Sequence, residues 1–176
     1  GRLGPSEWGE KRRADFVTDV DVAAERLIAD TLLGAVPDSS VVGEELSPDA
    51  EPGGLVWIVD PLDGTTNFLH RFPSYAVSIA ATLNGEILVG VVLHVPANIR
   101  YHAVRGGGAW QDGTRLAVSA IAEPRQALIG TGFPYAEIGQ IALYQRQFAA
   151  VIAGSGGLRR PGSAALDLCD VAAGRF

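Results

Sequence analysis

An apolar run that ends in an aspartate and passes straight into a turn constrains the fold more than any other feature. The run is Gly54-Leu55-Val56-Trp57-Ile58-Val59-Asp60, and Pro61-Leu62-Asp63-Gly64 follows it. Its length and continuous apolar character are typical of a strand covered on both faces, which predicts a central place in a sheet. Pro61 lacks the N–H of a sheet ladder, and Gly64 permits a sharp bend. The sequence thus predicts a buried strand that ends in two carboxylates, Asp60 and Asp63.

The residues after this bend offer groups that bind an anion. Thr65 and Thr66 can open a helix, and the first N–H groups of a helix have no partner within it. The stretch would then supply two carboxylates for a cation and N–H donors for a phosphate. Asp, Pro and Gly are also the usual residues of an ordinary turn, and that reading stays open for the short string alone.

A helix is predicted to begin after Thr18, a good N-cap, with Asp19 and Asp21 in the first turn, where the helix dipole favours anions. Gly34 and Pro37 are predicted to end it. Apolar residues recur along it at helical spacing: Val20, Ala24, Leu27, Ile28 and Leu32.

Hairpin signals fill the middle of the chain. Asn84-Gly85 separates the strand candidates 75–83 and 86–95, and Asp112-Gly113 marks a second hairpin after a strand at 100–104. Strand–helix alternation begins after Glu123-Pro124, which predicts two packed units, 1–122 and 123–176. The second unit is too small for a comfortable core of its own, and we expect the sequence to be a piece of a longer protein.

Two further acidic clusters complete the set of candidate site residues. Glu44-Glu45 ends a candidate strand at 41–44, and alone it would be a solvated pair. Asp21 alone would be a helix-start residue. If Glu44, Asp60 and Asp63 converge, each like-charged pair at 4 Å costs about 4 kcal/mol at an effective dielectric of 20. Oxygen ligands without histidine or cysteine favour Mg²⁺ as the neutralising cation.

The charge and composition of the chain narrow the classes of partner. A net charge of −6 argues against a nucleic-acid partner, because such proteins normally present a basic face. No apolar stretch is long enough to span a membrane and no secretory signal pattern is present, so we expect a cytoplasmic protein without a membrane partner. Cys169 is the single cysteine, which excludes an intramolecular disulfide and fits a reducing compartment.

Segments spread along the chain resemble the inositol monophosphatase family in order and separation. They are 41–45, 57–68 with 70–73, and 162–169, and the stretch from Asp15 to Asp21 resembles the family's first-helix entrance. The string from Asp60 to Phe68 is the most specific, and Thr66-Asn67-Phe68 favours the inositol side over the histidinol-phosphatase branch. The resemblance implies a layered α/β fold of the αβαβα sugar-phosphatase type, Li⁺ sensitivity and a homodimer.

The same resemblance implies a Mg²⁺-dependent phosphatase that uses metal-activated water and forms no phosphoenzyme. The small phosphorylated substrate would be inositol 1-phosphate first, or otherwise histidinol phosphate, fructose 1,6-bisphosphate or a nucleotide 3′-phosphate. Asp60 would bridge two Mg²⁺ ions. The implied metal ligands are Glu44, Asp60, Asp63 and the Leu62 carbonyl. The implied catalytic residues are Thr65, Asp21 and Glu44. The implied substrate-binding residues are Gly64, Thr65, Gly162, Ser163 and Ala164.

One departure from the family pattern bears on activity. A further metal aspartate and a substrate-binding glutamate of the family would lie beyond Phe176, so we expect the 176 residues alone to have little or no activity. A catalytically inactive family member that acts as a binding protein stays open as an alternative. Arg159-Arg160 is either a solvated basic pair or a contact for the substrate phosphate.

Overall fold

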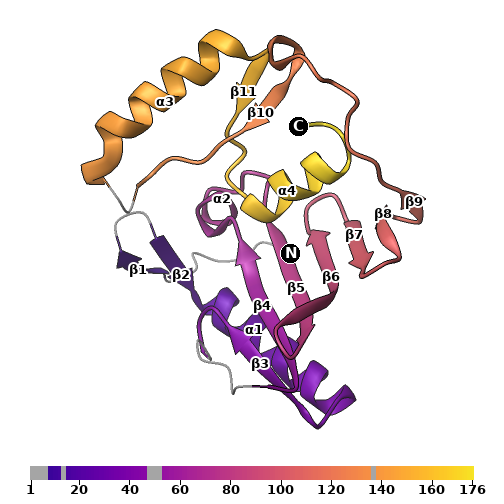
Figure 1. Cartoon of the computed structure of the whole chain (residues 1–176). Helices are drawn as coiled ribbons and strands as arrows, with labels where there is room; N and C mark the ends of the chain where they lie inside the picture. The colour runs from indigo at the N-terminus through magenta and orange to yellow at the C-terminus, as the bar shows by residue number, and fades with distance from the viewer. Residues whose placement is uncertain (1–7, 13–14, 47–52, 136–137) are drawn as a thin grey trace.

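The computed structural model describes residues 8–12, 15–46, 53–135 and 138–176 (Figure 1). Its helices are α1 (Asp19–Ala35), α2 (Thr65–Leu69), α3 (Ile141–Gly154) and α4 (Ala164–Ala172), with 3₁₀ turns η1 (Pro124–Gln126) and η2 (Ile138–Gln140). Its strands are β1 (Trp8–Arg12), β2 (Asp15–Thr18), β3 (Ser39–Gly43), β4 (Leu55–Asp63), β5 (Ala76–Leu83), β6 (Glu86–His94), β7 (Ile99–Val104), β8 (Gly108–Gln111), β9 (Thr114–Arg115), β10 (Leu128–Gly130) and β11 (Gly157–Arg159). The layered α/β architecture expected from the sequence is confirmed.

A mixed sheet in the order β3-β4-β5-β6-β7-β8-β9 forms the framework (Figure 1). β3 and β4 run parallel, and every later neighbour is antiparallel. The two predicted hairpins are confirmed: Asn84 and Gly85 have φ values of 52° and 82°, and Asp112 and Gly113 have 45° and 84°. These left-handed values suit the twist of adjacent antiparallel strands.

β4 runs farther than the sequence predicted and is less completely covered. It continues through Pro61 to Asp63, and the ladder with β5 skips from Asp60 to Asp63, which leaves Pro61 and Leu62 outside the pairing. β4 pairs on both sides but lies next to the edge strand β3, and Ile58 is 46% exposed. The strand therefore lies inside the sheet, as expected, but the expectation that both of its faces are covered is wrong at Ile58. Some apolar residues of β4 are only partly buried, because the strand lies next to the edge of the sheet.

α1 begins with a reciprocal cap, as predicted. The Thr18 hydroxyl accepts from the amides of Val20 and Asp21, while the Asp21 carboxylate accepts from the Thr18 amide. The side of the helix that is fully buried is acidic, because Asp21 and Glu25 are 2% and 1% exposed whereas Leu27 is 69% exposed. The apolar spacing located the helix but did not identify its most buried side chains.

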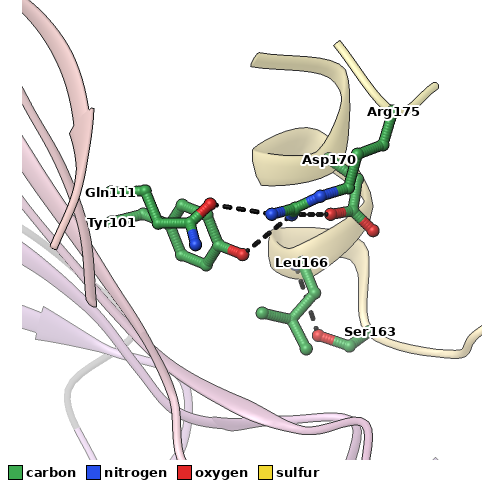
Figure 2. Close-up of polar contacts among 6 residues, drawn as sticks. All are labelled: Tyr101, Gln111, Ser163, Leu166, Asp170 and Arg175. Carbon is green, nitrogen blue, oxygen red and sulfur yellow. Dashed lines mark hydrogen bonds and ion pairs between the residues drawn. The ribbon is translucent and has the colours of Figure 1, made fainter. Parts of the chain in front are cut away.

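α4 covers the sheet and builds the core with it. Leu166 and Cys169 pack with Ala76 and Tyr101 in one buried cluster, and burial raises the pKa of the Cys169 thiol to about 11. Figure 2 shows how the end of this helix is fixed: the Arg175 guanidinium donates to Tyr101, Asp170 and Gln111. These contacts join α4 to β7 and β8.

The remaining elements form a smaller layer. β10 and β11 pair in parallel, and α3 lies along the outside of this ladder, away from the large sheet (Figure 1). The division at residues 122 and 123 stays a prediction. No helix among the described ranges has both the length and the apolar character that crossing a membrane requires.

Candidate metal and phosphate site

Parallel pairing places Glu44 beside the end of β4. Gly43, the last residue of β3, stands opposite Val59, so the next residue on each chain is Glu44 and Asp60. The carboxyl ends of parallel strands lie at the same edge of a sheet. The segments around these two carboxylates therefore meet although they are far apart in sequence.

Asp60 lies in a strongly acidic environment. Its pKa is raised from 3.8 to about 7, first because burial disfavours the charged form and then because Glu44, Asp63 and Asp21 are negative. The Leu62 amide donates to Asp60 Oδ1 at 3.1 Å and opposes this shift only in part. The charges that act on Asp60 here, those of Glu44, Asp63 and Asp21, are all negative.

Asp63 connects the bend to the start of α4. Its carboxylate accepts from the Ser163 hydroxyl at 2.5 Å, the Ala165 amide at 2.7 Å and the Ala164 amide at 3.2 Å. Ser163 is 1% exposed, and its hydroxyl also caps α4 by accepting from the Leu166 amide (Figure 2). The Ser163 side chain is therefore committed to structure, which leaves its backbone for any contact with a substrate.

Asp21 and Thr65 meet as the sequence analysis expected. Thr65 Oγ1 lies 3.0 Å from the Leu62 carbonyl and 3.3 Å from Asp21 Oδ1. One hydroxyl proton serves one acceptor at a time, so Thr65 can donate to either partner and accept from a third group. Asp21 is both the helix-start residue of α1 and a member of the candidate site.

Two glycine bends come together beside these carboxylates. Gly64 and Gly162 have φ values of 93° and 91°. A Cβ on Gly64 would lie 2.9 Å from the Ser74 carbonyl and 3.3 Å from the Gly162 carbonyl. The Asn67 amide group holds the two loops together by donating to the carbonyls of Ser74 and Pro161.

Sequence reasoning missed Glu25 and Asp167. Glu25 accepts from the amides of Glu45 and Leu46, directly beyond Glu44. Asp167 on α4 has a buried Oδ1 without a hydrogen-bond partner, and burial, Asp170 and Asp63 raise its pKa. The one signal for Glu25 was its position four residues after Asp21, which places both on one face of a helix.

Arg160 lies on the other side of the glycine bend. Its guanidinium lies 5.3 Å from the ring centroids of both Phe133 and Tyr135. A Cβ on Gly162 would meet its Nη1 at 2.7 Å. Arg160 is therefore a cation held by aromatic rings at the border of the candidate site.

The residues fit a divalent cation in chemistry and charge. The oxygens of Glu44, Asp60 and Asp63 are hard ligands, and burial and the neighbouring negative charges raise the pKa of Asp60, so a bound cation would favour its charged form. The described residues hold no group of three or more histidine, cysteine or acidic side chains close enough for a preformed cluster. Asp63 faces the α4 amides in this arrangement, so binding an ion would require its carboxylate to turn or share its oxygens.

Comparison with known proteins shows similarity to the family that the sequence motifs resemble. The model of the inositol monophosphatase family matches residues 4–176. An inositol-1-monophosphatase of Rhizobium meliloti is 44% identical over 94% of this chain and 63% of that protein. A Nus factor SuhB of Pseudomonas aeruginosa is 41% identical over 99% of this chain and 66% of that protein. The crystal structure of the extragenic suppressor protein suhB from Bartonella henselae aligns with a TM-score of 0.90 and 38% identity, over 97% of this chain and 66% of that one. The chain thus spans about two thirds of the length of these relatives.

Proposed function

The chain belongs to the inositol monophosphatase family, and we propose that the protein is a Mg²⁺-dependent phosphomonoesterase that hydrolyses a small polyol or sugar phosphate. Inositol 1-phosphate is the first candidate substrate. The observation that carries the proposal is the acidic surroundings of the partly buried Asp60, formed by Glu44, Asp63 and Asp21, next to two glycine bends that pack against each other. The acidic surroundings suit a cation, and the positive φ values of Gly64 and Gly162 allow the bends whose backbone amides would face a phosphate.

Four groups would hold Mg²⁺: the carboxylates of Glu44, Asp60 and Asp63 and the carbonyl of Leu62. When bound, Mg²⁺ lowers the pKa of a coordinated water and stabilises charge on the phosphate and the leaving oxygen. Asp60 would lie among them, because Glu44 and Asp63 both act on its charge.

The protein's own groups would orient the attacking water. Thr65 Oγ1 can donate to Asp21 Oδ1, 3.3 Å away, and then accept a hydrogen bond from a water molecule. Asp21 is buried and accepts from the Thr18 amide, so its carboxylate stays within hydrogen-bond reach of the Thr65 hydroxyl. Glu44 would assist from the end of β3, and the direct transfer to water leaves no covalent intermediate on the protein.

Substrate contacts would come from the backbone of the two bends. The amides of Gly64 and Thr65 would bind the phosphate, and residues 162–164 would line the polyol. Ser163 would contact the substrate only through its backbone, because its hydroxyl donates to Asp63. A Cβ at Gly64 or Gly162 would fill the space between the loops.

Phosphate release by the full-length gene product tests the proposed function. The assay compares inositol 1-phosphate, histidinol phosphate, fructose 1,6-bisphosphate and a nucleotide 3′-phosphate, each with Mg²⁺ or with a chelator. We expect Mg²⁺-dependent release and the highest kcat/KM for inositol 1-phosphate. Absence of release from every substrate at saturating Mg²⁺ would contradict the proposal.

Arg160 favours a second candidate within the same chemistry, a substrate with a second anionic group. Its guanidinium lies beside Gly162 and near enough to Asp167 to oppose the rise in the pKa of that carboxylate, and no hydrogen bond engages it within the described ranges. If such a substrate is used, Arg160→Ala should lower kcat/KM for fructose 1,6-bisphosphate about tenfold or more, as expected for a lost charged hydrogen bond of about 1.5–3 kcal/mol. Arg159→Ala is the neighbouring control. Equal effects on bisphosphate and inositol 1-phosphate would contradict this specific role.

A binding role is the other candidate, and the 41% identity to a protein named Nus factor SuhB favours it. The protein would then act as a Nus factor, as that relative is named, and hydrolysis would not be required. An Asp60→Asn gene product that retained the cellular role would support this reading. The expected absence of a direct nucleic-acid partner, the homodimer, the Li⁺ sensitivity and the cytoplasmic location remain predictions.

A further inference from the structure

Glu25 is a buried carboxylate at the back of the candidate site. It is 1% exposed, and each of its oxygens accepts one backbone amide: Glu45 N at 2.7 Å and Leu46 N at 2.9 Å. A carboxylate so deeply buried is costly unless its hydrogen bonds are satisfied. Both carboxylate oxygens of Glu25 accept hydrogen bonds from the two residues that follow Glu44.

The packing around Glu25 leaves it little freedom. A Cβ on Gly43 would lie 1.9 Å from Glu25 Oε1 and 2.1 Å from its carboxyl carbon. Glycine at the end of β3 therefore gives the carboxylate space against the backbone. Glu25 thus contacts the chain on both sides of Glu44: it packs against Gly43 before it and accepts hydrogen bonds from the Glu45 and Leu46 amides after it.

α1 thus acts on two parts of the site at once. Asp21 and Glu25 lie one turn apart on the same helix face, and Asp21 contacts Thr65 while Glu25 holds the Glu44 segment. A rigid helix fixes the separation of these two contacts. The distance between the water-orienting hydroxyl and the metal-binding edge is then set by the helix and not by the loop.

We propose that Glu25 is a positioning residue that fixes the backbone after β3 so that Glu44 faces the cation site, an inference that rests on the proposed function. Without Glu25, the Glu44 segment would lose two backbone hydrogen bonds, and the site would lose affinity for the cation. Glu25 acts through the backbone, because each of its oxygens accepts an amide of the segment that follows Glu44.

Calorimetric titration of the full-length gene product with Ca²⁺ and Mg²⁺ tests this role. Glu25→Asp keeps the charge but shortens the side chain, so it separates positioning from simple electrostatic attraction. We expect Glu25→Asp and Glu25→Gln each to weaken cation binding at least about tenfold, with Tm measured in parallel. Asp30→Asn, an exposed carboxylate on the same helix, should leave the affinity unchanged.

Each outcome has a separate meaning. Wild-type affinity in a folded Glu25→Asp protein would overturn the positioning role and leave the proposed function intact. Absence of cation binding by the wild-type protein would overturn both. If the variants do not fold, amide exchange in the wild-type protein decides: protected Glu45 and Leu46 amides support the inference, and exchange at the rate of an open loop overturns it.

Discussion

Asp60→Asn is expected to lower phosphate release by at least about 10³-fold and, in the presence of a chelator, to make the protein more stable. Activity falls because metal-assisted stabilisation of several kcal/mol is lost. Stability rises because the wild-type carboxylate is buried next to Glu44, Asp63 and Asp21. Asparagine keeps the oxygen that accepts from the Leu62 amide and removes the charge.

The stabilisation should depend on pH in a defined direction. The folded pKa of Asp60, about 7, lies above its ordinary value of 3.8, so the folded state favours the protonated form. Wild-type stability should therefore fall as pH rises from about 4 to about 7, and the advantage of Asp60→Asn should grow across that window. Partial exposure limits the full effect to about 2 kcal/mol.

Thermal unfolding at pH 4 and pH 8 in chelator measures this effect, and Asp38→Asn is the matched control because Asp38 is exposed. A less stable Asp60→Asn protein at pH 8 would contradict the account of the acidic field. Near-normal phosphate release would contradict the assignment of Asp60 as a ligand.

Gly64→Ala is expected to abolish most activity and to destabilise the fold. The residue has a φ of 93°, and a Cβ would lie 2.9 Å from the Ser74 carbonyl and 3.3 Å from the Tyr75 Cα. These neighbours are backbone atoms, so the bend must shift instead of a side chain. A displacement of about 1 Å in a catalytic loop can cost about 100-fold in rate, and we expect a loss of at least that size.

Gly85→Ala is the control that separates two effects in Gly64→Ala: the cost of a positive φ and the crowding of the new Cβ by neighbouring backbone atoms. Gly85 has a φ of 82°, and nothing lies within 4 Å of a Cβ placed there. Its substitution should therefore cost only about 1–2 kcal/mol of stability and leave kcat unchanged. Equal losses of stability and activity in Gly64→Ala and Gly85→Ala would show that the contact between the two bends is unimportant.

Local sequence signals were sufficient for the parts of the fold that depend on neighbouring residues. Thr18 and Asp21 predicted the start of α1, and Asn84-Gly85 predicted the β5–β6 hairpin, because caps and tight turns are set by a few adjacent residues. The string from Asp60 to Gly64 predicted the bend at Gly64, although β4 continues to Asp63 and not only to Asp60. These features carry their own backbone requirements.

The contacts that assemble the candidate site span long distances in sequence and could not be predicted in this way. Glu25 resembles any polar residue of a surface helix until the backbone of Glu45 and Leu46 packs against it. Asp63 likewise reads as a turn residue, yet it receives the α4 amides a hundred residues later. Leu27 follows the apolar spacing of α1 and is nonetheless exposed. Tertiary packing, and not local preference, decided these three cases.

A crystal structure of the full-length gene product soaked with Mn²⁺ tests the central claim most directly, because anomalous scattering locates the ion without assumptions about its ligands. We expect a peak at the edge of the sheet where β3 and β4 end, in direct contact with carboxylate oxygens of Glu44, Asp60 and Asp63. An ordered structure in which these carboxylates bind no Mn²⁺, or in which Glu44 points away from Asp60, would contradict it.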